Sequence, residues 1–158
     1  MGAKGFPSCI LERMTRRTFF ALSIAPALPA WGAGAKMQVY KTPTCGCCGK
    51  WVEHVRAAGF DISVTEVPDT TEYRRKAGVP DDLQSCHTAV VNGYAVEGHV
   101  PAADIQRLVA SRSKAKGLAV PGMPMGSPGM EGSRSDAYSV MLFSADGKAS
   151  VYKSYPAK

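Results

Sequence analysis

The chain has 158 residues, a formal net charge of +6 and 45% hydrophobic residues. This size and composition allow one domain with its own hydrophobic core. The basic residues are dispersed, and the longest uninterrupted basic run is residues 74–76. The sequence therefore gives little support to nucleic-acid binding.

Residues 1–35 have the features of an export signal. Arg16 and Arg17 are followed by two phenylalanines and a mostly apolar run to Ala30, and residues 33–35 are the small residues of a cleavage site. Paired arginines favour the twin-arginine route. The apolar run is about a dozen residues long and contains two prolines, so it is too short and too broken to cross a bilayer as a helix. We predict cleavage after residue 35 and a periplasmic protein without a membrane span.

Removing this segment changes both the charge and the cysteine count. Four basic residues and one acidic residue leave with it, so the formal charge falls from +6 to +3. Cys9 leaves too, and the predicted mature domain, residues 36–158, keeps four cysteines: Cys45, Cys47, Cys48 and Cys86. The periplasm is oxidising, so a lasting free thiol there needs a partner, and a soft metal ion would supply one.

The pattern after the signal predicts strands that alternate with helices. Trp51, Val55 and Ala58 recur at helical spacing, and Asn92-Gly93 between two β runs is typical of a hairpin turn. Pro101 is suited to open a helix. We predict strands at 37–41, 61–67, 88–91 and 94–97, and helices at 48–58, at 70–76 and after Pro101.

This order, β-α-β-α-β-β-α, predicts an α/β fold of the thioredoxin-like arrangement, with the first two strands parallel. Residues 112–136 then form a long segment rich in glycine, proline and methionine, which we expect to be a functional or flexible loop. Strands at 138–143 and 149–155 close the chain as a hairpin, with Asp146-Gly147 in its turn.

Three thiols lie within four residues in Cys45-Gly46-Cys47-Cys48, where the first strand turns into the first helix. Unpaired backbone N–H groups and the helix dipole favour thiolate at that place. Cys45 and Cys48 have the C-x-x-C spacing of a thiol/disulfide couple, so they are the candidate catalytic residues of an oxidoreductase. Cys47 adds a sulfur that such a couple does not need, and this third sulfur favours a soft metal.

Two structural interpretations of the cysteines stay open. Small exported domains often use clustered cysteines for structural disulfides, although the adjacent Cys47 and Cys48 would make a strained pair. A structural zinc site usually needs two separated pairs of ligands, and this sequence has one such pair.

Further candidate ligands lie elsewhere in the sequence. Thioredoxin-like proteins place a cis-proline just before the third strand, facing the active cysteines, whereas this chain has Cys86 and His87 there. Met123 belongs to the methionine-rich segment, whose thioethers suit Cu(I) as thiolates do. His99 lies two residues before Pro101, which is expected to open a helix. At that position it could cap the helix, pack against it or bind metal. We expect His54 to be a surface residue, because about two helical turns separate it from the sulfurs.

Four separated motifs resemble the small bacterial family that includes the CopG copper-resistance proteins, and together they cover nearly all of residues 37–155. They are Cys45-Gly46-Cys47-Cys48 with Trp51, Ser85-Cys86-His87-Thr88-Ala89, Glu97-Gly98-His99-Val100-Pro101-Ala102, and Gly117-Leu118-Ala119-Val120-Pro121-Gly122-Met123-Pro124 with Gly126-Ser127-Pro128-Gly129-Met130-Glu131. The resemblance implies a periplasmic thioredoxin-like protein that binds Cu(I) through the C-x-C-C sulfurs and takes part in copper redox chemistry.

With this resemblance, we predict that the four cysteines hold one Cu(I) ion or a thiolate-bridged polynuclear cluster. Met123 or a neighbouring methionine would close the site, and His87 or His99 would assist. The expected partners are copper ions and other periplasmic copper-handling proteins. The alternative function is a thiol/disulfide oxidoreductase that acts on periplasmic proteins through Cys45 and Cys48.

Overall fold

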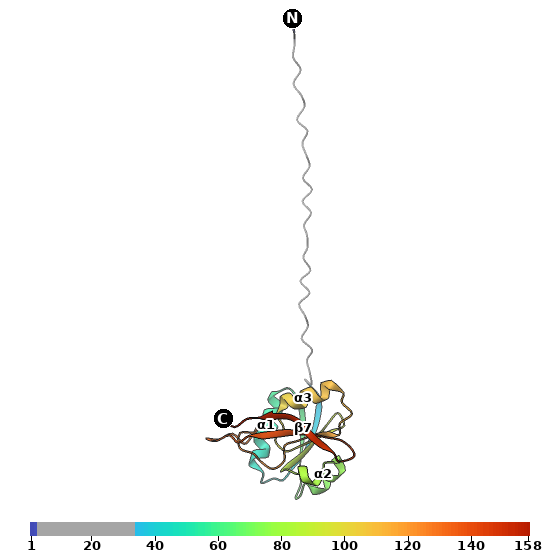
Figure 1. Ribbon diagram of the computed structural model, residues 1–158, viewed down its shortest axis with the longest axis vertical. Helices are drawn as coiled ribbons and strands as arrows, with labels where there is room; N and C mark the ends of the chain where they lie inside the picture. Colours follow the sequence, from blue (N-terminus) through green and yellow to red (C-terminus); the bar gives the residue numbers. More distant parts are fainter. Residues whose placement is uncertain (3–33) are drawn as a thin grey trace.

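The structure is a computed structural model that describes residues 1–2 and 34–158 (Figure 1). The predicted export signal, residues 1–35, therefore lies outside the described residues except at its two ends, and its cleavage and route stay predictions. The first strand begins directly after it, at Lys36. Among the described helices, none has the length and apolar character needed to cross a membrane.

The described part is a mixed α/β domain, which confirms the predicted class. The predicted order of its first seven strands and helices is also present, while the likeness to thioredoxin stays a prediction. In chain order the elements are β1 (Lys36–Lys41), α1 (Gly46–Ala57), β2 (Asp61–Glu66), α2 (Thr71–Ala77), the 3-10 helix η1 (Asp81–Leu83), β3 (His87–Val91), β4 (Tyr94–Glu97), α3 (Ala102–Ser111), β5 (Gly117–Ala119), β6 (Tyr138–Phe143) and β7 (Ala149–Tyr155).

The seven strands of the described part form one sheet in the order β2-β1-β3-β4-β5-β6-β7. β1 and β2 are parallel, as predicted for two strands joined by a helix, and β3 runs antiparallel to β1. The register places Lys41, the last residue of β1, opposite His87, the first residue of β3. The C-terminal end of β1 and the N-terminal end of β3 therefore lie side by side, at the same ends of the strands. This arrangement brings two distant cysteine segments together.

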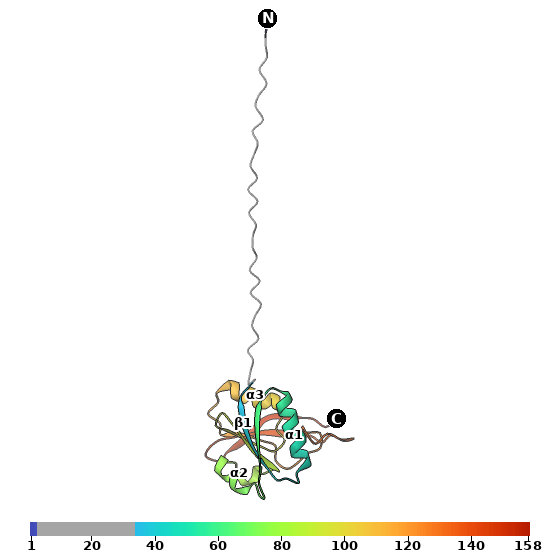
Figure 2. The same ribbon diagram turned by 180° about the vertical axis from the view of Figure 1, so that it is seen from behind.

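Helices cover both faces of the sheet, and neighbouring residues of a strand show which face is which. Val96 of β4 packs into the larger core with the buried residues of α1 and α3, whereas Ala95 packs into the smaller core with Ala77 of α2. Leu118 and Ala119 of β5 divide between the two cores in the same way. Figures 1 and 2 show α1 and α3 near each other and α2 apart from them at the lower end of the domain.

The prediction of one irregular segment over residues 112–136 is wrong in part, because it contains β5. Leu118 is fully buried, and β5 pairs with β4 and β6, so this short strand joins the hairpin to the rest of the sheet. Gly117 is required there, since a Cβ atom would overlap the carbonyl oxygen of Ala95. β5 has only three residues, and the glycine and proline residues around it are typical of loops, so the sequence pattern did not predict it. The part that remains irregular, residues 120–137, is called the methionine loop below.

A buried carboxylate attaches the C-terminal hairpin to α3. Asp104 is 0% exposed, and its oxygens accept a hydrogen bond from the Tyr155 hydroxyl at 2.6 Å and lie 3.2 Å from Arg107 Nη1 and 3.6 Å from Lys153 Nζ. The ring of Tyr155 also stacks on Tyr138 at a centroid distance of 4.8 Å. We call Asp104, Arg107, Lys153 and Tyr155 the hairpin anchor.

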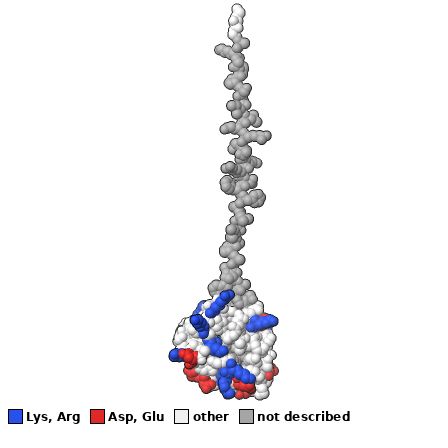
Figure 3. Space-filling model, turned by 90° about the vertical axis from the view of Figure 1, so that its right-hand side faces the viewer, with Lys and Arg blue, Asp and Glu red and all other residues white. Residues whose placement is uncertain are grey.

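The surface carries charges of both signs. On the face seen in Figure 3, basic side chains lie on both the upper and the lower part of the domain, and acidic ones lie among them toward its lower end. Some of the exposed charges pair, for example Lys148 with Asp146 at 2.9 Å. Exposed pairs of this kind contribute little to stability, so the fold depends mainly on its two cores.

Candidate metal centre

The C-x-C-C motif forms the N-terminus of α1. Cys45 is the residue that caps this helix, but no side-chain hydrogen bond caps it, and its first turn contains no acidic residue. Cys45 and Cys48 are joined by a disulfide, with their Cα atoms 5.4 Å apart, and Cys47 is free. Cys48 is fully buried, whereas Cys45 and Cys47 are half-buried. The structure therefore contains the oxidised form of the predicted thiol/disulfide couple.

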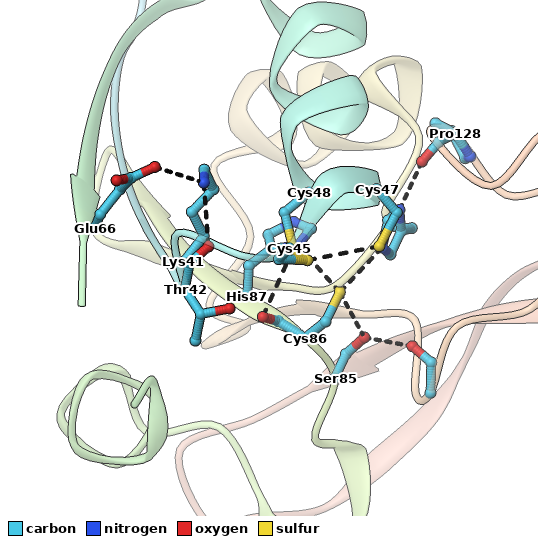
Figure 4. The surroundings of a disulfide bond; sticks show 12 residues. Lys41, Thr42, Cys45, Cys47, Cys48, Glu66, Ser85, Cys86, His87 and Pro128 are labelled. Atoms are coloured by element: carbon cyan, nitrogen blue, oxygen red, sulfur yellow. Dashed lines mark hydrogen bonds and ion pairs between the residues drawn. A yellow bond between two sulfur atoms is a disulfide. The ribbon is translucent and has the colours of Figure 1, made fainter. Parts of the chain in front are cut away.

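Cys86 brings the fourth sulfur to this helix terminus. It immediately precedes β3, and its carbonyl oxygen lies 3.8 Å from Cys48 Sγ (Figure 4). The Sγ atoms of Cys45 and Cys47 are 3.5 Å apart, and all four sulfurs lie within 4.8 Å of one another. The predicted approach of Cys86 to the other three sulfurs is present, while the role of these residues as metal ligands stays a prediction.

His99 directs its Nε2 atom at the Cys86 sulfur. These two atoms are 3.0 Å apart, and His99 Nδ1 lies 2.7 Å from the carbonyl oxygen of Pro128. Because a carbonyl can only accept, Nδ1 carries the proton and Nε2 presents its lone pair to the sulfur. Burial lowers the pKa of His99, which favours this neutral form. An imidazole whose other nitrogen is fixed in this way is arranged as histidine ligands of metals usually are.

His87 is buried completely beside the same sulfur. Its Nδ1 atom lies 3.4 Å from Cys86 Sγ, and its ring packs against Trp51 at 4.3 Å and edge-on to His99 at 5.1 Å. Burial, with a smaller effect from His99, lowers the pKa of His87 to about 3, so the ring is neutral near pH 7. Within the described residues, its Nε2 atom has no hydrogen-bond partner. A buried nitrogen of this kind is costly unless something binds it.

Burial also acts on the Cys86 thiol. It raises the pKa of Cys86 to about 12, and the neighbouring Cys47 sulfur adds to the increase. The metal-free thiol is therefore protonated at neutral pH, and it lies at a distance at which it can donate its proton to the His99 lone pair. A bound cation reverses this preference, because metal binding to cysteine releases the thiol proton. We call Cys45, Cys47, Cys48, Cys86, His87 and His99 the cysteine–histidine cluster.

The methionine loop packs against the first turn of α1 and against the Cys86 segment. Gly129 has a positive φ of +86°, and a Cβ atom there would lie 2.7 Å from the Cys47 carbonyl oxygen. Ser85 donates a hydrogen bond to the carbonyl oxygen of Gly122 at the other end of the loop. Met123, the next residue, is 53% exposed. Its role as a sulfur ligand stays a prediction.

His54 lies outside the cluster, as predicted. It is exposed on α1, and its Nε2 atom accepts a hydrogen bond of 3.1 Å from the backbone N–H of Ala102 at the start of α3. Burial of part of the ring lowers its pKa. This histidine therefore joins two helices, and it provides a natural control for the two histidines of the cluster.

Sequence reasoning missed the polar residues beneath the cluster. Glu97, at the end of β4, is 0% exposed and accepts hydrogen bonds from the Ser85 backbone N–H at 2.7 Å, from the Thr88 hydroxyl at 2.7 Å and from Arg74 Nε at 3.2 Å. Burial raises the pKa of Glu97, which these donors partly offset. Glu97 thereby fixes both sides of the segment that holds Cys86. A single acidic residue in the apolar run Tyr94–Glu97 was the signal that could have identified it.

Comparisons with known proteins agree with this site. Residues 83–130 match a family model described as "Protein of unknown function, DUF411". No curated protein matches the chain. Two solved structures, titled copper resistance protein CopG form 1 and form 2, are each 46% identical to it with a TM-score of 0.74. The similarity covers 78% of this chain and 98% and 99% of those chains.

The fold and the cluster thus define a mixed α/β protein with a cysteine-rich metal-binding site where β1, α1 and β3 meet. Because the similar structures are 46% identical and are covered almost completely, the chain belongs to the CopG family of copper resistance proteins. A role in copper resistance follows at this coarse level, and copper is the metal that the site suggests.

Proposed function

We propose that the chain binds Cu(I) as cargo through the thiolates of Cys45, Cys47, Cys48 and Cys86 and acts in periplasmic copper resistance. The observation that carries this proposal is the approach of four sulfurs from two distant segments to within 4.8 Å of one another. Thiolate is the ligand type that Cu(I) favours, whereas a thiol/disulfide couple needs only two cysteines. Binding through all four sulfurs requires the Cys45–Cys48 disulfide to be reduced, because disulfide sulfurs cannot act as thiolates.

The other residues of the site have separate roles in this proposal. His99 would bind copper through the Nε2 lone pair that faces Cys86, and its hydrogen bond to the Pro128 carbonyl oxygen holds the ring in that orientation. Trp51, which is fully buried and packs against His87, shields one side of the cluster from water. Met123 lies next to the Cys86 segment through Gly122 and would supply a thioether at the exposed side. We propose sequestration of copper or copper redox chemistry as the outcome of binding.

The location of the protein belongs to the same proposal. Residues 1–35 would direct export and be removed, which leaves residues 36–158 in the periplasm. β1 begins at Lys36, so cleavage after residue 35 would leave every described strand and helix complete. Other periplasmic copper-handling proteins are the expected partners.

A second function, thiol/disulfide exchange with other proteins, is favoured by one observation. Cys45 and Cys48 form a disulfide at a helix N-terminus, with Cys45 half-buried and Cys48 buried. An accessible sulfur backed by a buried one is suited to attack by an incoming thiolate. This reaction needs neither Cys47 nor Cys86.

Two substitutions separate the functions. In the reduced protein, Cys86→Ser is expected to weaken Cu(I) binding by more than the 10–100-fold typical of residues that only support a ligand. Cu(I) affinity is measured by competition with a chromogenic chelator, and reduction of a disulfide substrate is measured in parallel. If Cys86→Ser binds copper as the parent does while Cys45→Ser abolishes disulfide reduction, the chain is a thiol oxidoreductase and the copper proposal is wrong.

A further inference from the structure

The Cys45–Cys48 disulfide divides the cysteine–histidine cluster into two sets of donors. One set is the two sulfurs that the disulfide joins, which lack thiolate character while they are joined. The other set consists of atoms that stay free in the oxidised protein: the sulfurs of Cys47 and Cys86 and the imidazoles of His87 and His99. The oxidised structure therefore contains a donor set of its own.

This remaining set has the geometry of a site. The donor atoms of Cys86, His87 and His99 all lie within 4.8 Å of one another, with the Cys86 sulfur 3.0 Å from His99 Nε2 and 3.4 Å from His87 Nδ1. Metal–sulfur and metal–nitrogen bonds of roughly 2.0–2.3 Å separate neighbouring donors by similar distances. His87 is fully buried, and packing against Trp51 holds its ring with Nδ1 beside the Cys86 sulfur.

We propose that the chain has two copper-binding states, which the redox state of Cys45 and Cys48 selects. The oxidised protein holds a single Cu(I) at Cys86, His87 and His99, with Cys47 beside them. The reduced protein adds two thiolates and holds more than one Cu(I). This inference rests on the proposed copper function and specifies how the same site is regulated.

A dithiol reductant converts the first state into the second. Its thiolate attacks Cys45 Sγ, which is more accessible than the buried Cys48 sulfur, and the bond between Cys45 and Cys48 breaks. Cys48 leaves with the electron pair and takes up a proton. The second thiol of the reductant then attacks the reductant sulfur of the mixed disulfide, and Cys45 is released as a thiol. Two electrons and two protons have passed to the protein, and the reductant leaves as a disulfide.

The main experiment titrates the oxidised and the reduced full chain with Cu(I) against a chromogenic chelator, under anaerobic conditions. We expect one Cu(I) per oxidised chain and more than one per reduced chain. Alkylation followed by peptide mapping verifies the redox state of each cysteine, and in the oxidised protein Cu(I) should protect Cys86 from alkylation. Equal copper content in the two states, or no binding by the oxidised chain, would overturn the inference. If the reduced chain also binds no Cu(I), the proposed function itself fails.

Three variants test which residues bind copper in the oxidised and in the reduced state. The double variant Cys45→Ser/Cys48→Ser should bind one Cu(I) whether or not reductant is present. His99→Gln should weaken binding to the oxidised chain by at least about 10-fold. His54→Gln is the matched control, because glutamine can still accept the hydrogen bond from Ala102 and His54 lies outside the cluster. Equal losses in the two histidine variants would contradict the assignment.

Discussion

The cysteine–histidine cluster and the hairpin anchor both bury polar groups, but they satisfy them differently. In the anchor, the Asp104 carboxylate accepts hydrogen bonds from Tyr155 and Arg107 and forms an ion pair with Lys153. In the cluster, a buried nitrogen of His87 has no partner within the described residues, and the half-buried Cys86 thiol faces a lone pair of His99. A polar group that a fold buries with all its partners stabilises the fold, whereas one that it buries without them costs stability, as is common at functional sites.

Glu97 stands between these two cases. It is as buried as Asp104 and its carboxylate is fully bonded, yet its donors include the backbone of Ser85, next to Cys86. It therefore stabilises the fold and positions the cluster at once. The contrast between Glu97 and Asp104 can be tested by neutralising each carboxylate with little change of shape.

The largest expected effect is that of Glu97→Gln. It leaves the buried Arg74 guanidinium without its charge partner, and loss of one member of a buried pair costs about 3–5 kcal/mol of unfolding free energy. Because Ser85 also loses a strong acceptor, Cu(I) affinity of the reduced protein should fall. Asp104→Asn should be destabilising but leave Cu(I) affinity unchanged. Denaturant unfolding and chelator competition measure the two quantities, and an equal loss of affinity in both variants would remove the distinction.

The next effect is a pH dependence caused by His87. Its pKa is about 3 in the folded protein and near its ordinary value of 6.5 in the unfolded chain. Between these values only the unfolded chain binds the proton, so this group lowers stability progressively as pH falls from 6.5 toward 3. In metal-free protein, His87→Gln should flatten this part of the stability profile, as followed by unfolding at a series of pH values. A profile as steep as that of the parent would show that His87 is not buried in its neutral form.

A smaller effect is expected at the hairpin anchor. Tyr155→Phe removes a hydrogen bond of 2.6 Å to a buried carboxylate, a contact of the kind that contributes about 1.5–3 kcal/mol. Thermal unfolding should detect this loss, while copper content stays that of the parent. Reduced copper content in this variant would mean that the anchor and the cluster are coupled.

The smallest effect is that of Met123→Leu. Leucine keeps the volume and removes the sulfur, and the side chain is 53% exposed, so stability should not change. We expect a mild loss of Cu(I) affinity in the chelator competition. An unchanged affinity would remove Met123 from the set of ligands without affecting the assignment of the cysteines.

Some features of the site were predictable from the sequence alone. The position of Cys86 opposite the C-x-C-C motif was predictable, because the thioredoxin-like order puts the start of the third strand beside the end of the first. The turn at Asn92-Gly93 was predictable from local chemistry, and both residues have the positive φ values that the turn requires. These features depend on short patterns that tertiary packing leaves in place.

Other features depend on contacts that no local pattern encodes. The contact between His99 and Cys86 requires the hydrogen bond that His99 donates to the Pro128 carbonyl oxygen in the methionine loop, about thirty residues further along the chain. Asp104 is an acidic residue in the first turn of a helix, a common position that carries no sign of burial, and the C-terminal hairpin packs against it in the folded chain. The disulfide between Cys45 and Cys48 was one of several pairings and metal sites that the spacing left open.

The most direct test of the account is X-ray absorption spectroscopy at the copper edge on the reduced protein loaded with Cu(I). We predict Cu(I) with a first shell dominated by sulfur and a minor nitrogen contribution that His99→Gln reduces and His54→Gln does not. A first shell of nitrogen and oxygen alone would contradict the central claim that the four cysteines gather to bind copper.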